Sequence, residues 1–127
     1  MKNLLIVDSD PMFTTTLSHI LAREQFSVTV AKDGKEAASR LAAGSFDLII
    51  TDMLMPYTNG LELINRVRSD KSSRHTPVMV ISSVSNEQSI SSWLKAGADS
   101  YFKKPLDIPV LLSSIKQLMI HEGHAAA

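Results

Sequence analysis

The stretch DLIITDMLMP, residues 47–56, decides the fold class of this chain. Its apolar run Leu48, Ile49 and Ile50 is followed by a threonine and then by Asp52. A short, continuous apolar run with polar residues at both ends is typical of a parallel strand that is covered on both faces. We therefore expect a buried strand here, with Asp52 at its carboxyl end.

Four more segments have the character of strands, and amphipathic segments separate them. Residues 4–7 and 78–81 are continuous apolar runs, residues 27–30 are β-branched, and residues 100–102 form a short aromatic run. Apolar side chains recur at helical spacing in residues 13–21, 37–42, 61–67, 90–94 and 108–119. Helix-start signals precede several of these, such as Asp10 before Pro11 and the capping-box spacing from Ser85 to Gln88.

This alternation predicts an α/β fold with five strands and five helices. Consecutive βα units form a right-handed, doubly wound parallel sheet with helices on both faces. We adopt the strand order 2-1-3-4-5 of flavodoxin-like sheets as the expected order. We assign residues 1–121 to one domain and residues 122–127 to a frayed tail or linker remnant.

Composition narrows the class of protein. The chain has 127 residues, of which 44% are hydrophobic, as in a globular protein, and its 13 Lys and Arg balance its 13 Asp and Glu. Without a basic excess, direct binding to nucleic acid is not expected. There is no cysteine, which excludes disulfides and thiolate metal sites. The apolar run after the N-terminus is too short for a signal peptide or a membrane span, so we expect a cytoplasmic protein without membrane contact.

Polar side chains gather where the predicted strands end. Asp8, Asp52 and Ser82 end the first, third and fourth strands, and Lys104 follows the fifth. Ligands of open α/β sheets bind at the carboxyl ends of the strands, so these groups are expected to meet there. Closely placed carboxylates suit Mg²⁺ or Mn²⁺, and a lysine and a hydroxyl suit phosphoryl oxygens. The set predicts a phosphoryl-transfer site with a carboxylate nucleophile.

From about residue 2 to residue 119 the chain resembles the receiver domain of two-component response regulators. Five motifs match that family in order and spacing: LLIVD (4–8), DLIITDMLMP (47–56), NGLEL (59–63), PVMVISS (77–83), and GAD with KKP (97–99 and 103–105). The resemblance implies that Asp52 accepts a phosphoryl group, that Lys104 is the essential lysine, that Ser82 is the switch hydroxyl and that Tyr101 is an aromatic that turns inward on activation.

The metal site implied by the resemblance departs from the family pattern at one position. The backbone carbonyl of Leu54 is implied to join Asp8 and Asp52 around the ion. Receivers usually carry two consecutive acids after the first strand, and the second is here Ser9. Asp10 either contacts the ion through a water or caps the following helix. We expect metal binding and phosphorylation that are weakened by Ser9 but not abolished.

The resemblance also implies partners. A histidine kinase or a histidine phosphotransfer protein is the expected donor, and a downstream output domain or protein, or a second copy in a homodimer, is expected to read the surface around the fourth helix, the fifth strand and the fifth helix. Trp93 is expected to pack on the fourth helix. The chain is expected to catalyse at most its own phosphorylation and dephosphorylation.

Two alternatives remain open from the sequence. An atypical receiver, with Ser9 in place of the acid, would act as an interaction module that does not depend on phosphorylation. Alternatively, LIVDSD (residues 5–10) resembles the first motif of haloacid-dehalogenase-type phosphohydrolases, with Asp8 as nucleophile and Asp10 as general acid. An FMN carrier is disfavoured, because the acids after the first strand would repel the phosphate.

Overall fold

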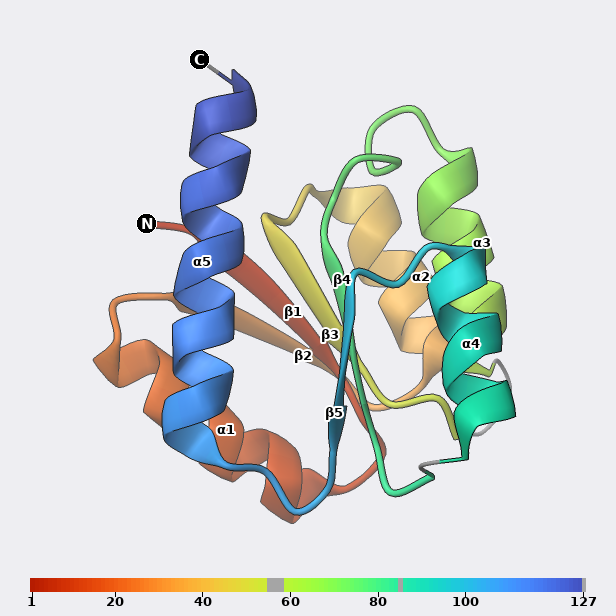
Figure 1. Ribbon diagram of the computed structural model, residues 1–127. Coiled ribbons are helices and arrows are strands. Elements are labelled where there is room, and N and C mark those ends of the chain that lie inside the picture. The colour runs from red at the N-terminus through yellow and green to blue at the C-terminus, as the bar shows by residue number, and fades with distance from the viewer. Residues whose placement is uncertain (55–58, 85, 127) are drawn as a thin grey trace.

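A five-stranded parallel sheet forms the centre of the molecule (Figure 1). The computed structural model describes residues 1–54, 59–84 and 86–126. Its strands are β1 (Asn3–Val7), β2 (Ser27–Ala31), β3 (Leu48–Thr51), β4 (Val78–Ser82) and β5 (Ser100–Lys103). Neighbouring strands pair in parallel in the order β2-β1-β3-β4-β5. The predicted fold class and strand order are confirmed.

Helices cover both faces of the sheet. They are α1 (Pro11–Arg23), α2 (Gly34–Ala43), α3 (Gly60–Ser69), α4 (Glu87–Ala96) and α5 (Ile108–Ala126). Figure 1 shows α1 and α5 on one side of the sheet and α2, α3 and α4 on the other. Residues 122–126, expected to form a tail or linker, lie within the bounds of α5, and the domain boundary at residue 121 stays a prediction. None of the helices in the described part of the chain is long and apolar enough to cross a membrane.

The two faces of each central strand enter different hydrophobic clusters. Leu4 and Ile6 of β1 pack with apolar side chains of α1 and α5, whereas Leu5 and Val7 pack with those of α2, α3 and α4. All four side chains are fully buried. Because side chains alternate between the faces of a strand, burial of both faces demands an uninterrupted apolar run. This is why residues 4–7, 48–50 and 78–81 show no polar alternation.

Side-chain caps fix where the helices begin. Asp10, Asp33 and Asn59 accept backbone N–H groups at the starts of α1, α2 and α3. The cap expected at Ser85 lies outside the described residues, and α4 is instead capped by Asn86, whose side chain accepts the Ser89 N–H at 2.8 Å. Both residues have side chains suited to an N-cap, and the sequence alone does not separate two candidates one position apart.

An arginine that sequence reasoning did not single out ties α3 to the amino ends of β4 and β5. The Arg68 guanidinium donates to the carbonyls of Thr76 at 2.6 Å and Gly97 at 2.7 Å. It also pairs with Asp99 at 3.0 Å, and the same carboxylate oxygen accepts the Val78 N–H at 2.7 Å. One side chain therefore satisfies backbone carbonyls in the loops before β4 and β5. No local sequence pattern predicts these contacts.

Replacing Arg68 with alanine is expected to lower the free energy of unfolding by about 2 kcal/mol, because partly buried carbonyls lose a charged donor. Urea denaturation monitored by circular dichroism measures this. Arg66→Ala, an exposed arginine on the same helix, is the control and should stay within about 0.5 kcal/mol of the parent protein. Equal effects of the two substitutions would contradict a specific role for Arg68.

Candidate functional site

The carboxyl edge of the sheet brings together the residues that the sequence singled out. Asp8 and Asp52 directly follow β1 and β3, which are neighbours in the sheet. The Asp52 N–H donates to the Val7 carbonyl at 2.8 Å, so the strand pairing continues up to the carboxylate. Lys104 follows β5, and its N–H donates to the Ser82 carbonyl at 3.0 Å. The strand ladder itself therefore places these groups.

Lys104 joins the two carboxylates. Its Nζ lies 2.7 Å from Asp8 Oδ2 and 3.4 Å from Asp52 Oδ2, so one ammonium group contacts both acids. The Asp8 side chain is 3% exposed and that of Asp52 is 13% exposed. Asp8 therefore forms the floor of the site, and Asp52 is the carboxylate that a reactant meets first.

The surroundings of Lys104 keep it charged. Burial by itself lowers the pKa of Lys104, but the hydrogen bond to Asp8 and the negative charges of Asp52 and Asp8 outweigh burial and raise the pKa above its usual 10.5. A lysine whose pKa is higher in the folded than in the unfolded state stabilises the folded state, and the full contribution is present at every pH below the unfolded-state pKa. The contribution is lost only as the pH rises through the folded-state pKa. Across the neutral range Lys104 is thus a fixed positive charge.

Asp10 caps α1. Its carboxylate accepts the N–H groups of Met12 at 3.0 Å and Phe13 at 3.3 Å. Its own N–H donates to Asp8 Oδ1 at 2.9 Å, which fixes the deeper carboxylate from the loop side. The structure thus contains the cap, which uses one carboxylate oxygen, Oδ1, and the contact of Asp10 with a metal ion through a water stays a prediction. Ser9, between the two acids, is exposed.

The two carboxylates of the site, Asp8 and Asp52, suit a hard cation that keeps several water ligands. In residues 1–54, 59–84 and 86–126 no group of three or more acidic, histidine or cysteine side chains gathers as a metal site. Two adjacent carboxylates nevertheless match Mg²⁺, which is often held by one or two carboxylates and several waters. The Leu54 N–H donates to Asp52 Oδ1 at 3.3 Å, so Leu54 stays beside the carboxylate. The residues present fit the ion.

A chain of hydrogen bonds runs from Ser82 to Tyr101. The Ser82 hydroxyl is fully buried and accepts the Val84 N–H at 3.1 Å. The Tyr101 hydroxyl donates to the carbonyl of the same Val84 at 2.7 Å. The Tyr101 ring lies 5.6 Å from that of Trp93, which belongs to α4 and is buried in the core with 8% exposure. The resemblance implied that Tyr101 turns inward on activation. In this structure Tyr101 is already half-buried, so an inward turn would not begin from a fully exposed side chain.

Two neighbours of the site were not anticipated from the sequence. The Phe13 ring lies 4.3 Å from Lys104 Nζ, a cation–π contact. Val84 links Ser82 to Tyr101 through its backbone alone. Phe13 belongs to the apolar stripe of α1 and nothing distinguishes it within that stripe, while a backbone link leaves no signature in residue type. In contrast, the cis peptide bond between Lys104 and Pro105 is one that a proline after the lysine allows.

The chain and its fold are similar to those of known proteins. The family model of the response regulator receiver domain matches residues 4–116. Response regulator ArlR of Staphylococcus haemolyticus is 32% identical over 119 residues, which cover 94% of this chain and 53% of that protein. ArlR of Staphylococcus aureus shows the same identity and coverage. The chain thus spans about half the length of these curated relatives.

Solved structures share the whole fold. The receiver domain of Francisella response regulator 1452 superposes with a TM-score of 0.89 at 28% identity, over 96% of this chain and 99% of that one. The chemotaxis protein CheY4 of Vibrio cholerae superposes with a TM-score of 0.88 at 27% identity, over 93% and 98%. Together with the family match over residues 4–116, these likenesses show that the chain belongs to the response regulator receiver domain family.

Proposed function

We propose that this receiver domain is a phosphorylation switch in which Asp52 accepts a phosphoryl group from a phosphohistidine of a histidine kinase or a histidine phosphotransfer protein. The observation that carries the proposal is the placement of Lys104 between a buried Asp8 and a more exposed Asp52 at the carboxyl edge of the sheet. This set pairs a reachable nucleophile with a fixed positive charge.

In the proposed step a carboxylate oxygen of Asp52 attacks the phosphorus of the donor. The P–N bond of the phosphohistidine breaks, its electron pair returns to the imidazole, and the phosphoryl group forms an acyl phosphate on Asp52. Lys104 donates a hydrogen bond to a phosphoryl oxygen, and Ser82 can offer its hydroxyl proton to another. Attack by water on the phosphorus later restores the carboxylate and releases phosphate.

Mg²⁺ or Mn²⁺ would be held by Asp8, Asp52 and the backbone carbonyl of Leu54. When bound, the ion supplies positive charge that offsets the phosphoryl oxygens beside the two carboxylates. Asp10 would take part only through a water, because its Oδ1 already accepts the Met12 and Phe13 N–H groups at the start of α1.

The direct test incubates the protein with acetyl phosphate and Mg²⁺ and maps the adduct by mass spectrometry. One phosphoryl group on the peptide that contains Asp52 is expected. A protein that stays unmodified at saturating donor and Mg²⁺ would contradict the proposal and favour the interaction module that does not depend on phosphorylation.

Ser9→Asp is expected to tighten Mg²⁺ binding by about tenfold, because it restores an anionic group next to Asp8. Isothermal titration calorimetry of the apo protein measures this. Ser91→Asp, which adds the same charge to an exposed position on α4, is the matched control and should leave the affinity unchanged. Equal affinities for the parent protein and Ser9→Asp would mean that this position does not limit metal binding.

Ser82→Ala is expected to leave Asp52 open to phosphorylation but to uncouple it from the surface around α4 and β5. A hydroxyl drawn towards the phosphoryl group would release the Val84 N–H, and Val84 holds Tyr101 against Trp93. A ligand can bias a fold only through contacts that differ between two states, and these bonds are such contacts.

The measurement compares phosphate occupancy with the fluorescence of Trp93, the single tryptophan, and with self-association or partner binding induced by phosphate. Ser83→Ala, the exposed neighbour, is the control. A Ser82→Ala protein that is fully phosphorylated and responds like the parent would rule out this route and leave the loop after Asp52 as the output surface.

The proposed output is binding of a downstream domain, a downstream protein or a second copy to the face formed by α4, β5 and α5, in the cytoplasm. The domain is then a signalling module that catalyses only its own phosphorylation and dephosphorylation. A phosphohydrolase centred on Asp8 is not favoured, because Asp8 is buried and bound to Lys104 while the Asp10 carboxylate is engaged at the helix cap.

A further inference from the structure

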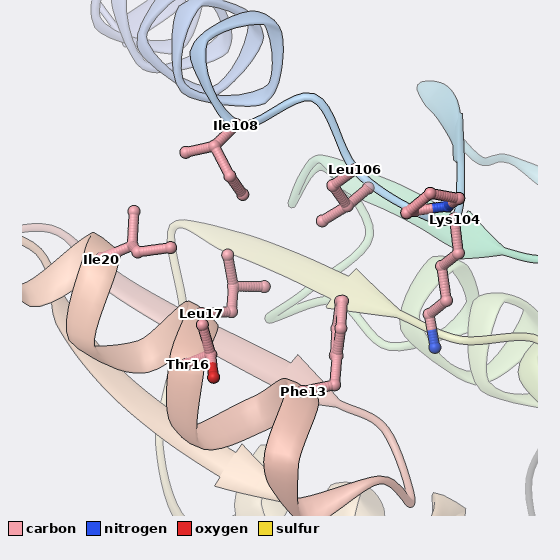
Figure 2. Close-up of a pocket in the computed structure, with 8 residues that line it drawn as sticks. Phe13, Thr16, Leu17, Ile20, Lys104, Leu106 and Ile108 are labelled. Atoms are coloured by element: carbon pink, nitrogen blue, oxygen red, sulfur yellow. The ribbon is translucent and has the colours of Figure 1, made fainter.

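A cavity of about 450 Å³ opens between α1 and the connection from β5 to α5. Figure 2 shows Leu17 and Ile20 pointing into it from α1, and Leu106 and Ile108 pointing towards them from the opposite wall. Its volume falls within the range of pockets that enclose small molecules. The lining residues come from α1, from the connection between β5 and α5, and from the start of α5, and neither Asp8 nor Asp52 is among them.

The lining limits the chemistry of an occupant. Phe13, Leu17, Ile20, Leu106 and Ile108 supply apolar and aromatic surface, and Thr16 adds a single hydroxyl. Among the lining residues that the structure describes, Lys104 is the one that carries a charge, and its Nζ is paired with Asp8 and Asp52. In this described wall an anionic occupant would find no unpaired positive charge, and it would face two carboxylates behind the wall. An ammonium occupant would compete with Lys104 for those acids. Charge complementarity therefore favours an uncharged, largely apolar molecule.

The cavity shares a wall with the phosphoacceptor site. The Phe13 ring contacts Lys104 Nζ at 4.3 Å, and the stem of Lys104 belongs to the lining (Figure 2). A molecule that fills the cavity packs on Phe13 and on this stem, so it restrains Lys104, whose ammonium group contacts both carboxylates.

We propose that this cavity is a binding site for an uncharged, largely apolar small molecule, and that its occupancy restrains Lys104. Binding itself does not depend on the proposed function, whereas an effect on phosphorylation rests on it.

The test uses indole as the probe and follows the methyl resonances of leucine and isoleucine by NMR. Saturable shifts confined to Leu17, Ile20, Leu106 and Ile108 are expected, with a Kd of about 1 mM or lower for a molecule of this size. Indole-3-acetate, the same ring with a carboxylate, is expected to bind at least about tenfold more weakly. Indole shifts that do not saturate, or that spread over the surface, would overturn the site. Tighter binding of the acetate would overturn the assigned ligand class.

Ile20→Trp is expected to fill the cavity and to weaken indole binding at least about tenfold, and Ile108→Trp fills it from the opposite wall if the first variant folds poorly. His19→Trp adds the same side chain at an exposed neighbouring position on α1 and should bind indole like the parent. Unchanged binding in both filled variants would overturn the site. Sedimentation of the indole-free protein tests a second copy as the occupant: methyl shifts that grow with protein concentration, together with a dimer, would overturn the small-molecule assignment.

The last arm measures the initial rate of phosphorylation by acetyl phosphate with and without saturating indole. This rate is expected to decrease at least twofold. A restrained Lys104 moves less readily from Asp8 and Asp52 towards the incoming phosphoryl group. An equal rate at saturation would overturn the restraint on Lys104 while the methyl shifts still report the site. Absence of phosphorylation without indole would instead reject the proposed function.

Discussion

Replacing Asp52 with asparagine is expected to abolish phosphorylation by acetyl phosphate, with a rate reduced at least about 1,000-fold. Asparagine keeps the shape of the side chain but its amide oxygen is not a competent nucleophile. The fold should survive, because Lys104 keeps its closer partner Asp8 at 2.7 Å. The free energy of unfolding is expected to change by no more than about 1 kcal/mol. Intact-mass spectrometry of the parent and the variant measures the loss.

Asp8→Asn is the matched control for this experiment. Asp8 is 3% exposed and lies beneath Asp52, so its amide variant should still form the adduct on Asp52, at a lower rate because one carboxylate of the proposed metal site is missing. If phosphorylation persists in Asp52→Asn and disappears in Asp8→Asn, the phosphoryl group is on Asp8. That result would support the alternative function as a phosphohydrolase with Asp8 as nucleophile.

Gly60→Ala is expected to lower the free energy of unfolding by about 3 kcal/mol, roughly a 10 °C decrease in Tm. Gly60 begins α3 and donates its N–H to the Met53 carbonyl at 3.1 Å. A Cβ on Gly60 would lie 2.8 Å from the Asp52 carbonyl oxygen and 2.8 Å from the Met53 Cα, and would also meet the Met53 sulfur. Backbone atoms cannot turn aside as a flexible side chain does, so α3 or the segment after Asp52 must move.

Gly44→Ala provides the comparison, because a Cβ there meets no atom within 4 Å. That variant should be as stable as the parent or more stable by about 0.5 kcal/mol, since alanine restricts the unfolded chain. Thermal unfolding followed by circular dichroism compares the two glycines. Because the clash at Gly60 acts on the segment that carries Asp52, the same variant should also accept phosphate more slowly. A Gly60→Ala protein as stable as Gly44→Ala would show that the close approach is not needed.

Much of the site was predictable because it depends on strand ends. An apolar run that stops at an acid marks a carboxyl end, and parallel strands bring such ends to one edge. Asp8, Asp52 and Ser82 were placed on this edge because they end strands, and Lys104 was distinguished from Lys103 by the family resemblance. The structure has all four residues at this edge. Their roles in phosphoryl transfer stay predictions until the adduct is mapped.

Features that depend on distances between distant segments were beyond the sequence. Tyr101 is half-buried, and its hydroxyl donates to the backbone carbonyl of Val84 on another segment of the chain. Arg68 gave no sign that its guanidinium satisfies carbonyls near β4 and β5. In each case the partner is a backbone group, and backbone groups are the same in every sequence.

The sequence by itself determined the five-stranded parallel sheet and the acids and lysine at its carboxyl edge. Hydrophobic periodicity and residue type are local properties, so they can be recognised in the sequence alone. Only the tertiary structure decided that Asp8 lies deeper than Asp52 and that Phe13 and Lys104 share the wall of a cavity. Depth, hydrogen-bond partners and empty volume arise where segments far apart in the chain pack together, and packing in three dimensions is not encoded in any one segment.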